Sequence, residues 1–172
     1  MKPIDHKLLR RFLKIAGDRL SGDWVIIGGT VLLLKGIMHR VTHDIDIAGS
    51  ESASQKDLRL LFEIAEELGL PIEAINQAAP FFLHQIKGWK SDLEKIHSGK
   101  KAKLYCPSPT LFIRLKIRRL TDTDLQDCLH LLRKRPELDK KILERELVAL
   151  IRTGENPERG RRAEELLNAI RM

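Results

Sequence analysis

The chain has 172 residues, which is enough for one domain with its own hydrophobic core. Its net charge of +7 gives it a basic surface that attracts phosphates, so nucleotides, RNA and DNA are all admissible partners. No apolar run approaches the roughly 18–20 residues that a membrane helix needs, and the N-terminal segment lacks the apolar core of a signal peptide. We therefore expect a cytoplasmic protein with no membrane partner.

The hydrophobic pattern of the first part of the chain alternates between helices and short strands. The expected helices cover residues 4–20, 30–35 and 55–68, because apolar residues recur there at helical spacing. The short run of residues 24–27 is apolar and rich in β-branched side chains, which predicts a buried strand. Residues 44–48 alternate as in a strand, with Asp44 and Asp46 on one face and Ile45 and Ile47 on the other.

The pattern between residues 72 and 89 is ambiguous, and we expect one strand near 72–75 and another near 82–86. A further strand is expected over residues 103–106. The remaining part of the chain has helical spacing over residues 110–120, 123–132, 138–151 and from 157 onward. This order predicts an α+β fold with a small mixed β-sheet backed by helices. We divide it into an α/β core over residues 1–107 and a C-terminal helical region over residues 108–172 packed on the core.

Cys106 and Cys128 lie outside any paired cysteine motif, and the histidines do not stand near them at zinc-ligand spacing. We expect two reduced thiols in apolar surroundings.

Two glycines, Gly28 and Gly29, follow the first predicted strand and open a helix. Glycine allows a ligand to approach the backbone closely, and a helix N-terminus offers N–H groups to an anion. Taken alone, the pair is also what an ordinary turn contains.

The two aspartates Asp44 and Asp46 are costly neighbours, because like charges on one strand face raise each other's pKa unless a cation compensates them. Mg²⁺ takes oxygen ligands and is commonly held by one or two carboxylates together with substrate phosphates. The alternative is an exposed strand face on which both carboxylates are merely solvated.

In combination, the Gly-Gly-Thr turn and the segment Arg-Val-Thr-His-Asp-Ile-Asp-Ile resemble the signature of the nucleotidyltransferase superfamily. More narrowly, they resemble its small bacterial branch that includes toxin–antitoxin nucleotidyltransferases. The resemblance implies a nucleoside triphosphate as substrate and Mg²⁺ or Mn²⁺ as cofactor, with Asp44 and Asp46 as metal ligands and catalytic residues. The residues that it assigns to nucleotide binding are Gly28, Gly29, Thr30, Arg40 and Thr42. Arg40 would pair with a phosphate, and the alternative for it is an ordinary surface arginine.

A second match to the same branch covers the strand-to-helix segment from Cys106 to Asp127. There the resemblance makes Lys116 a catalytic residue that helps to neutralise the triphosphate, and Asp124 and Asp127 support the edge of the site. Helical spacing alone offers another interpretation, in which Lys116 and Arg119 form an ion-pair cluster with the two aspartates and no ligand is involved.

Nucleotidyltransferases of this type carry a third carboxylate on a later strand, as a general base or as a ligand of a second metal. Glu73 is the candidate, and Asp92, in a stretch typical of a loop or a helix, is the alternative. If neither is placed correctly, the chain binds nucleotide without efficient catalysis.

The resemblance thus predicts a metal-dependent enzyme, toxin-like or housekeeping, that moves a nucleoside monophosphate to a hydroxyl of RNA, including tRNA, or of a protein. It also admits an antitoxin-like protein as partner. The first alternative is a catalytically degenerate module that acts through a partner protein or nucleic acid. The second is a basic nucleic-acid binder that uses Lys- and Arg-rich runs such as residues 133–135 and 159–162, which are otherwise solvated helix faces.

Overall fold

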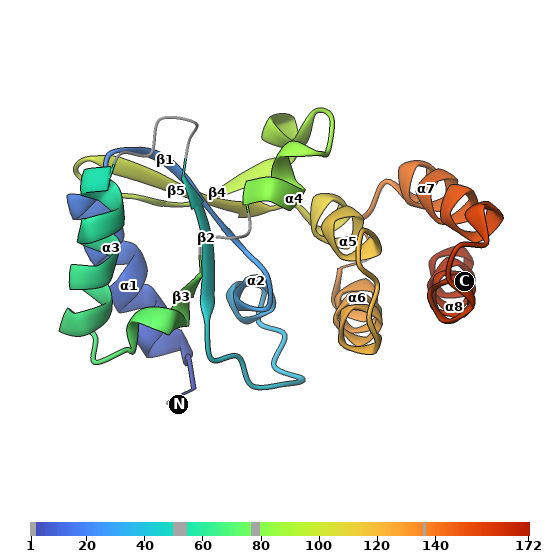
Figure 1. Ribbon diagram of the computed structural model, residues 1–172, viewed down its shortest axis with the longest axis horizontal. Helices are drawn as coiled ribbons and strands as arrows, with labels where there is room; N and C mark the ends of the chain where they lie inside the picture. The colour runs from blue at the N-terminus through green and yellow to red at the C-terminus, as the bar shows by residue number, and fades with distance from the viewer. Residues whose placement is uncertain (1–2, 50–54, 77–79, 136) are drawn as a thin grey trace.

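The computed structural model describes residues 3–49, 55–76, 80–135 and 137–172. In these ranges the chain forms a mixed five-stranded sheet with helices on both faces, and a group of helices extends from one end of it (Figure 1). The predicted α+β fold, with a small mixed sheet and C-terminal helices, is therefore confirmed.

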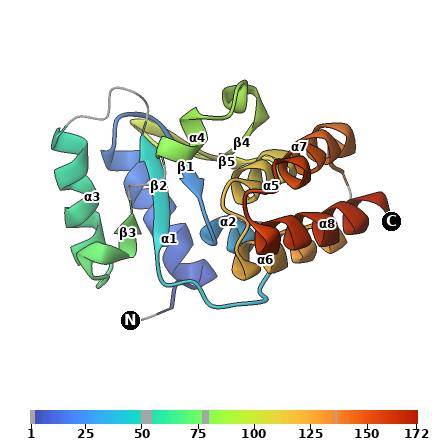
Figure 2. The same ribbon diagram turned by 45° about the vertical axis from the view of Figure 1, so that its right-hand side comes forward.

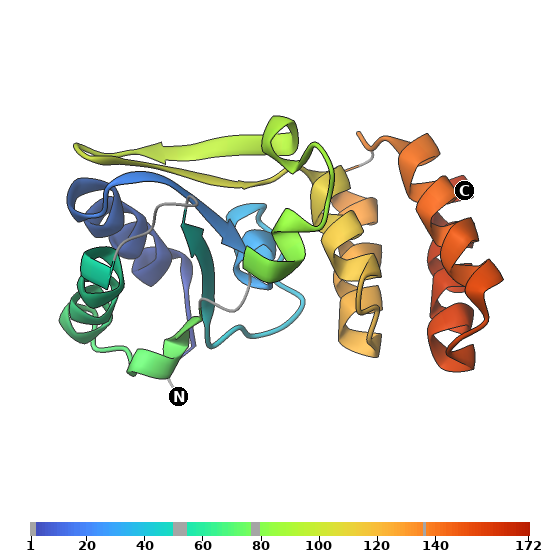
Figure 3. The same ribbon diagram turned by 45° about the horizontal axis from the view of Figure 1, so that its top comes forward.

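The strand order in the sheet is β3-β2-β1-β5-β4. The central strand β1 runs antiparallel to β2 and parallel to β5, β2 runs parallel to β3, and the hairpin of β4 and β5 closes the other edge, along the top of Figure 3. The strand bounds are β1 Gly22–Ile27, β2 Ile45–Gly49, β3 Ile75–Asn76, β4 Leu93–Ser98 and β5 Ala102–Pro107. A register that pairs Asp46 with Asn76 places the start of β2 beside the short edge strand.

One face of the sheet is covered by helices α1 (His6–Arg19) and α3 (Gln55–Glu67), which lie side by side in Figures 1 and 3. They bury Trp24 and Ile26 of β1 together with Ile45 and Ile47 of β2, and both β2 isoleucines have no exposed surface. Burial of four such side chains stabilises the fold by roughly 1.5–3 kcal/mol each. The predicted alternation along β2 is confirmed.

The opposite face carries a smaller apolar cluster, in which Val25, Ile27 and Ala48 pack against Leu83 and Ile86. Leu83 belongs to the short helix α4 (Pro80–His84). Because side chains alternate along a strand, Asp46 points to this second face, between α4 and the helices that follow β5.

The C-terminal helices build a core of their own. Their bounds are α5 Pro109–Ile117, α6 Asp122–Lys134, α7 Lys140–Thr153 and α8 Pro157–Arg171. Figure 2 shows α5, α6, α7 and α8 together at one end of the molecule. Their core also includes Val31 and Leu32 of the helix α2 (Thr30–Leu34), and Cys106 and Cys128 lie in it as buried free thiols, as expected. The core of the C-terminal helices thus contains residues from both sides of residue 107. The division of the chain into two regions at residue 107 stays a prediction. Within the described ranges, no helix has the length and apolar content needed to cross a membrane.

The predictions fail between residues 72 and 98. The strand expected near residues 82–86 is wrong, because this segment is the helix α4 followed by a turn. The strand expected over residues 72–75 begins later, since residues Ile72–Ala74 form a 3₁₀ turn (η1) before β3. The region around Asp92, expected to be a loop or a helix, contains a second 3₁₀ turn (η2, Trp89–Asp92) and then the strand β4.

Candidate functional site

The two predicted metal ligands lie at the start of β2. Asp44 precedes the strand and is exposed, whereas Asp46 is half-buried. Asp44 accepts a hydrogen bond from Thr42 Oγ1 at 3.2 Å, and Asp46 accepts one from Asn76 Nδ2 at 2.8 Å. Burial, together with the charge of Asp44, raises the pKa of Asp46 to about 6. Within the described residues, neither carboxylate has a cationic side chain as its direct partner, which is the electrostatic setting of a cation site.

The glycine pair before α2 is required by the side chains around it. Gly28 has a φ of +69°, and a Cβ atom at this position would stand 1.8 Å from Asp46 Oδ2. A Cβ atom on Gly29 would stand 2.6 Å from Arg40 Nη2. The two glycines therefore let a carboxylate and a guanidinium lie directly against the backbone. Their predicted contact with phosphate stays a prediction.

Two threonines hold the acidic loop in place. The buried Thr30 donates a hydrogen bond from Oγ1 to the carbonyl oxygen of Asp44 at 2.8 Å. Thr42, also buried, donates to the carboxylate of the same aspartate. In this arrangement both hydroxyls donate hydrogen bonds to Asp44 and so stabilise its loop. Contact of Thr30 or Thr42 with a phosphate stays a prediction.

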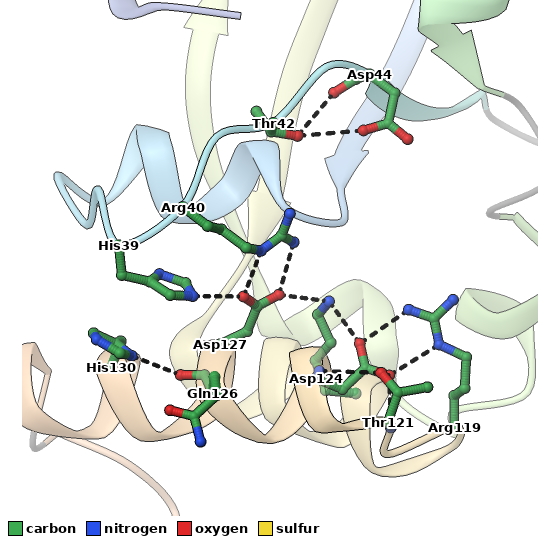
Figure 4. Close-up of polar contacts among 11 residues, drawn as sticks. His39, Arg40, Thr42, Asp44, Arg119, Thr121, Asp124, Gln126, Asp127 and His130 are labelled. Atoms are coloured by element: carbon green, nitrogen blue, oxygen red, sulfur yellow. Dashed lines mark hydrogen bonds and ion pairs between the residues drawn. The ribbon is translucent and has the colours of Figure 1, made fainter. Parts of the chain in front are cut away.

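In a second polar group, two aspartates of α6, Asp124 and Asp127, both contact Lys116 of α5; the two aspartates are labelled in Figure 4. Lys116 Nζ lies 2.9 Å from both Asp124 Oδ1 and Asp127 Oδ2, and neither aspartate side chain is exposed. Burial acts against every charge here, yet the ion pairs prevail: the pKa of Lys116 is raised, and the pKa values of Asp124 and Asp127 are lowered. The ion-pair cluster that helical spacing predicted is present.

The same cluster reaches across to the acidic loop through Arg40. Its guanidinium donates to both oxygens of Asp127, from Nε at 2.8 Å and Nη2 at 2.9 Å (Figure 4). His39 adds its Nε2 atom 2.9 Å from Asp127 Oδ1, outside hydrogen-bond alignment, and its ring stacks on His130 at 4.1 Å between centroids. Arg40 thus fixes the loop to α6, and its predicted contact with phosphate stays a prediction for the third of the side chain that remains exposed.

A cavity of about 170 Å³ lies between the acidic pair and the buried cluster. Asp46 and Gly28 line it from the sheet side, Lys116 lines it from the end of α5, and Arg119 lines it from the turn that follows. Arg119 also donates to Asp124 at 2.9 Å while two thirds of its side chain stay exposed. The structure therefore brings Gly28, Asp46 and Lys116, all predicted site residues, to one cavity, and adds Arg119.

The predicted third carboxylate is not at this site. Glu73 is exposed in η1, and Asp92 stands 3.7 Å from Arg114, away from the cavity lining. No group of three acidic, histidine or cysteine side chains able to share a metal occurs among the described residues. The residue beside Asp46 on the neighbouring strand is Asn76, which the prediction missed. Its one sequence signal is its place directly after the apolar Ile75.

The donor set at Asp44 and Asp46 fits a hard divalent cation. Both groups are carboxylates, one is exposed and the other lines a cavity, and their hydrogen-bond partners in the described parts of the chain are neutral. Mg²⁺ prefers such oxygen ligands and retains water and phosphate oxygens in its remaining positions. The prediction that these two aspartates hold the metal is consistent with this chemistry.

Two aspartates at the start of a strand, next to a Gly-Gly turn on a small mixed sheet, are features of a nucleotidyltransferase-type protein. Over residues 4–154, the chain matches the family described as "Nucleotidyltransferase of unknown function (DUF6036)", and it belongs to this family. No curated protein and no solved structure matches the chain. The matched region contains the sheet, the cavity and the ion-pair cluster.

Proposed function

We propose that this protein is a Mg²⁺-dependent nucleotidyltransferase that moves a nucleoside monophosphate from a nucleoside triphosphate to a hydroxyl group. The observation that carries the proposal is the pairing of opposite charges across one cavity. Asp46, next to Asp44, lies on the sheet side, and Lys116 and Arg119 lie on the helix side. A metal–triphosphate complex carries both signs of charge and complements both sides.

Mg²⁺ or Mn²⁺ bound by Asp44 and Asp46 would offset the charge of the triphosphate and polarise the α-phosphate. Lys116 and Arg119 stabilise the negative charge that grows on the leaving pyrophosphate. Asp124 and Asp127 hold the Lys116 ammonium in a fixed position, so it needs no reorganisation during the reaction.

The acidic loop and the turn before α2 complete the proposed site. The backbone of Gly28, Gly29 and Thr30 would approach the phosphates, while Arg40, through Asp127, and Thr42 would hold the loop that carries Asp44. The acceptor hydroxyl attacks the α-phosphorus in line, its proton passes to water, and pyrophosphate leaves.

The net charge of +7 favours RNA, including tRNA, as the acceptor, with a protein hydroxyl as the other class. A toxin-like role and an antitoxin-like partner rest on the resemblance to the toxin–antitoxin branch, and the cytoplasmic location stays a prediction from the sequence.

A specific observation favours a second function, a nucleotide-binding module without turnover. Asn76 stands beside Asp46 at the place where a neighbouring strand would offer a third carboxylate, and an amide cannot act as a general base. Such a module keeps the metal–nucleotide complex and works through a partner protein or nucleic acid.

The test is binding and transfer with each labelled nucleoside triphosphate, with and without Mg²⁺, in the presence of total RNA and of the protein itself. Asp46→Asn should lower Mg²⁺-dependent affinity by at least about a hundredfold, because metal–phosphate charge stabilisation is worth several kcal/mol. Asp23→Asn, at an exposed aspartate of β1, is the matched control.

Binding with transfer supports the enzyme, and binding without transfer to any acceptor supports the second function. A folded protein that binds no nucleotide in Mg²⁺ contradicts both.

A further inference from the structure

The cavity beside Asp46 is divided into an apolar part and a charged part along one face of α5. Phe112, Leu115 and Lys116 line it from one face of α5, at helical spacing, and Arg119 lines it from the turn that follows. The first two of these residues are apolar and the last two are cationic. The cavity therefore offers apolar contact toward the start of α5 and ion-paired cations at its end, where Asp124, the partner of both, also lines it.

Phe82 of α4 and Ile27 at the end of β1 add an aromatic ring and an aliphatic side chain to the same lining. The side chain of Phe82 is 45% exposed, which leaves much of an aromatic side chain in water beside a polar site. A planar group that packs on this ring removes apolar surface from water. The neighbouring Phe81 is 68% exposed but does not line the cavity, although the two rings contact each other edge to face at 5.5 Å.

Nucleotides have the same division as the cavity, with a planar base at one end and phosphates at the other. With the phosphates at Asp46, Lys116 and Arg119, the base comes to the apolar part. Aromatic side chains stack on any base, because every base has a π-face, and one such contact is worth about 1–3 kcal/mol.

We propose that the apolar part of this cavity is the binding site for the base of the nucleotide, with Phe82 as the residue on which the base stacks. The proposal rests on the proposed function for the place of the phosphates. The proposal adds Phe82 as the residue that distinguishes a nucleotide from a bare polyphosphate. Phe82 binds the base by stacking. We therefore expect purines to bind more tightly than pyrimidines.

The experiment compares three probes by titration calorimetry in Mg²⁺: ATP, inorganic tripolyphosphate and adenosine. The wild-type protein should bind ATP at least about fivefold more tightly than tripolyphosphate, from the lower limit of stacking energies. Phe82→Ala should lower ATP affinity by a similar factor and leave tripolyphosphate affinity unchanged. Phe82→Trp should retain the preference for ATP, and Phe81→Ala is the matched control that should change neither affinity.

Equal affinities of the wild-type protein for ATP and tripolyphosphate would overturn the proposal. So would equal losses of both ligands in Phe82→Ala, or a loss of ATP preference in Phe81→Ala. Adenosine separates this failure from failure of the proposed function. If neither triphosphate compound binds but adenosine does, in a manner that Phe82→Ala abolishes, the base site stands and the proposed function fails. If none of the three probes binds the folded protein, both fail.

Discussion

The molecule contains two pairs of aspartates in opposite electrostatic states. Asp124 and Asp127 are fully buried, and Lys116, Arg40 and Arg119 supply their counter-charges. Asp46 lines the cavity and Asp44 precedes Asp46 in the chain by two residues, and both have neutral hydrogen-bond partners among the described residues.

The difference shows in the pKa values. Burial raises the pKa of Asp46 to about 6, whereas in the α6 pair the effect of burial is outweighed by arginine and lysine, so that both pKa values are lowered. A carboxylate that the protein neutralises itself contributes to the fold, and one left uncompensated is ready for a cation from solution. Residue type and spacing alone do not distinguish the Asp44–Asp46 pair from the Asp124–Asp127 pair.

The largest expected effect is on stability. Asp127→Asn removes the charge partner of Arg40 and leaves the buried Lys116 with Asp124 alone, and we expect a loss of about 3 kcal/mol in the free energy of unfolding. Asp46→Asn, which removes a like-charge neighbour, should change that free energy by less than about 1 kcal/mol. Urea denaturation measures both.

Asp122→Asn is the matched control, because this aspartate stands at the start of the same helix with 80% of its side chain exposed. Although the Arg162 side chain is largely buried, the Asp122 carboxylate is exposed to water, so we expect their pair to contribute about 0–1 kcal/mol. An Asp127→Asn variant as stable as Asp122→Asn would remove the distinction between the two acidic pairs.

A smaller effect is expected from acid. The pKa values of Asp124 and Asp127 are lower in the folded protein than the value of about 3.9 in an unfolded chain. Their contribution to stability is therefore complete above pH 4 and is lost as the pH falls below 4, by up to about 1.4 kcal/mol per pH unit for each group. Denaturation at pH 5, 4 and 3 should show this decline in the wild-type protein and a shallower decline in Asp127→Asn. Identical slopes would contradict the role of Asp127.

The smallest effect concerns Asn76. Asn76→Asp places a third carboxylate beside Asp46, which should destabilise the metal-free protein and tighten Mg²⁺ binding by about tenfold, because affinity rises with the charge of the ligand set. Thermal melting with and without Mg²⁺ measures the change, and Asn76→Ala controls for the loss of the amide hydrogen bond. Weaker Mg²⁺ binding in Asn76→Asp would show that Asn76 does not face the metal.

Local patterns predicted the elements whose buried side chains follow a regular period. The isoleucines of β2 and the apolar face of α1 are examples, and both were identified because each element buries one face. The segment around Phe82 was misassigned because its most apolar residues, Phe81 and Phe82, are exposed. Its buried residues, Leu83 and Ile86, have the spacing of one helical turn.

The strand β4 was missed for a related reason. It is an edge strand of half-exposed and charged residues such as Glu94 and Lys95, and it exists through its pairing with β5. Strand formation here depends on a partner more than on composition.

In the candidate site, too, contacts between residues close in the sequence could be predicted and contacts between distant residues could not. Asp44 and Asp46 stand two residues apart, and Lys116 and Asp124 are eight apart, so local spacing was enough to predict both groups. Arg40 and Asp127 are separated by 87 residues, and Asn76 meets Asp46 only through the pairing of β2 with β3. No local pattern contains those contacts.

The bond between Arg40 and Asp127 has a consequence for the order of events during synthesis. The acidic loop leaves the ribosome long before α6, so the nascent chain carries Asp44 and Asp46 without the helix that anchors their loop. The loop that carries the two aspartates reaches its final arrangement only after residue 127 has emerged and α6 has docked. In a partly made chain, Asp44 and Asp46 therefore lie in a loop that is not yet anchored.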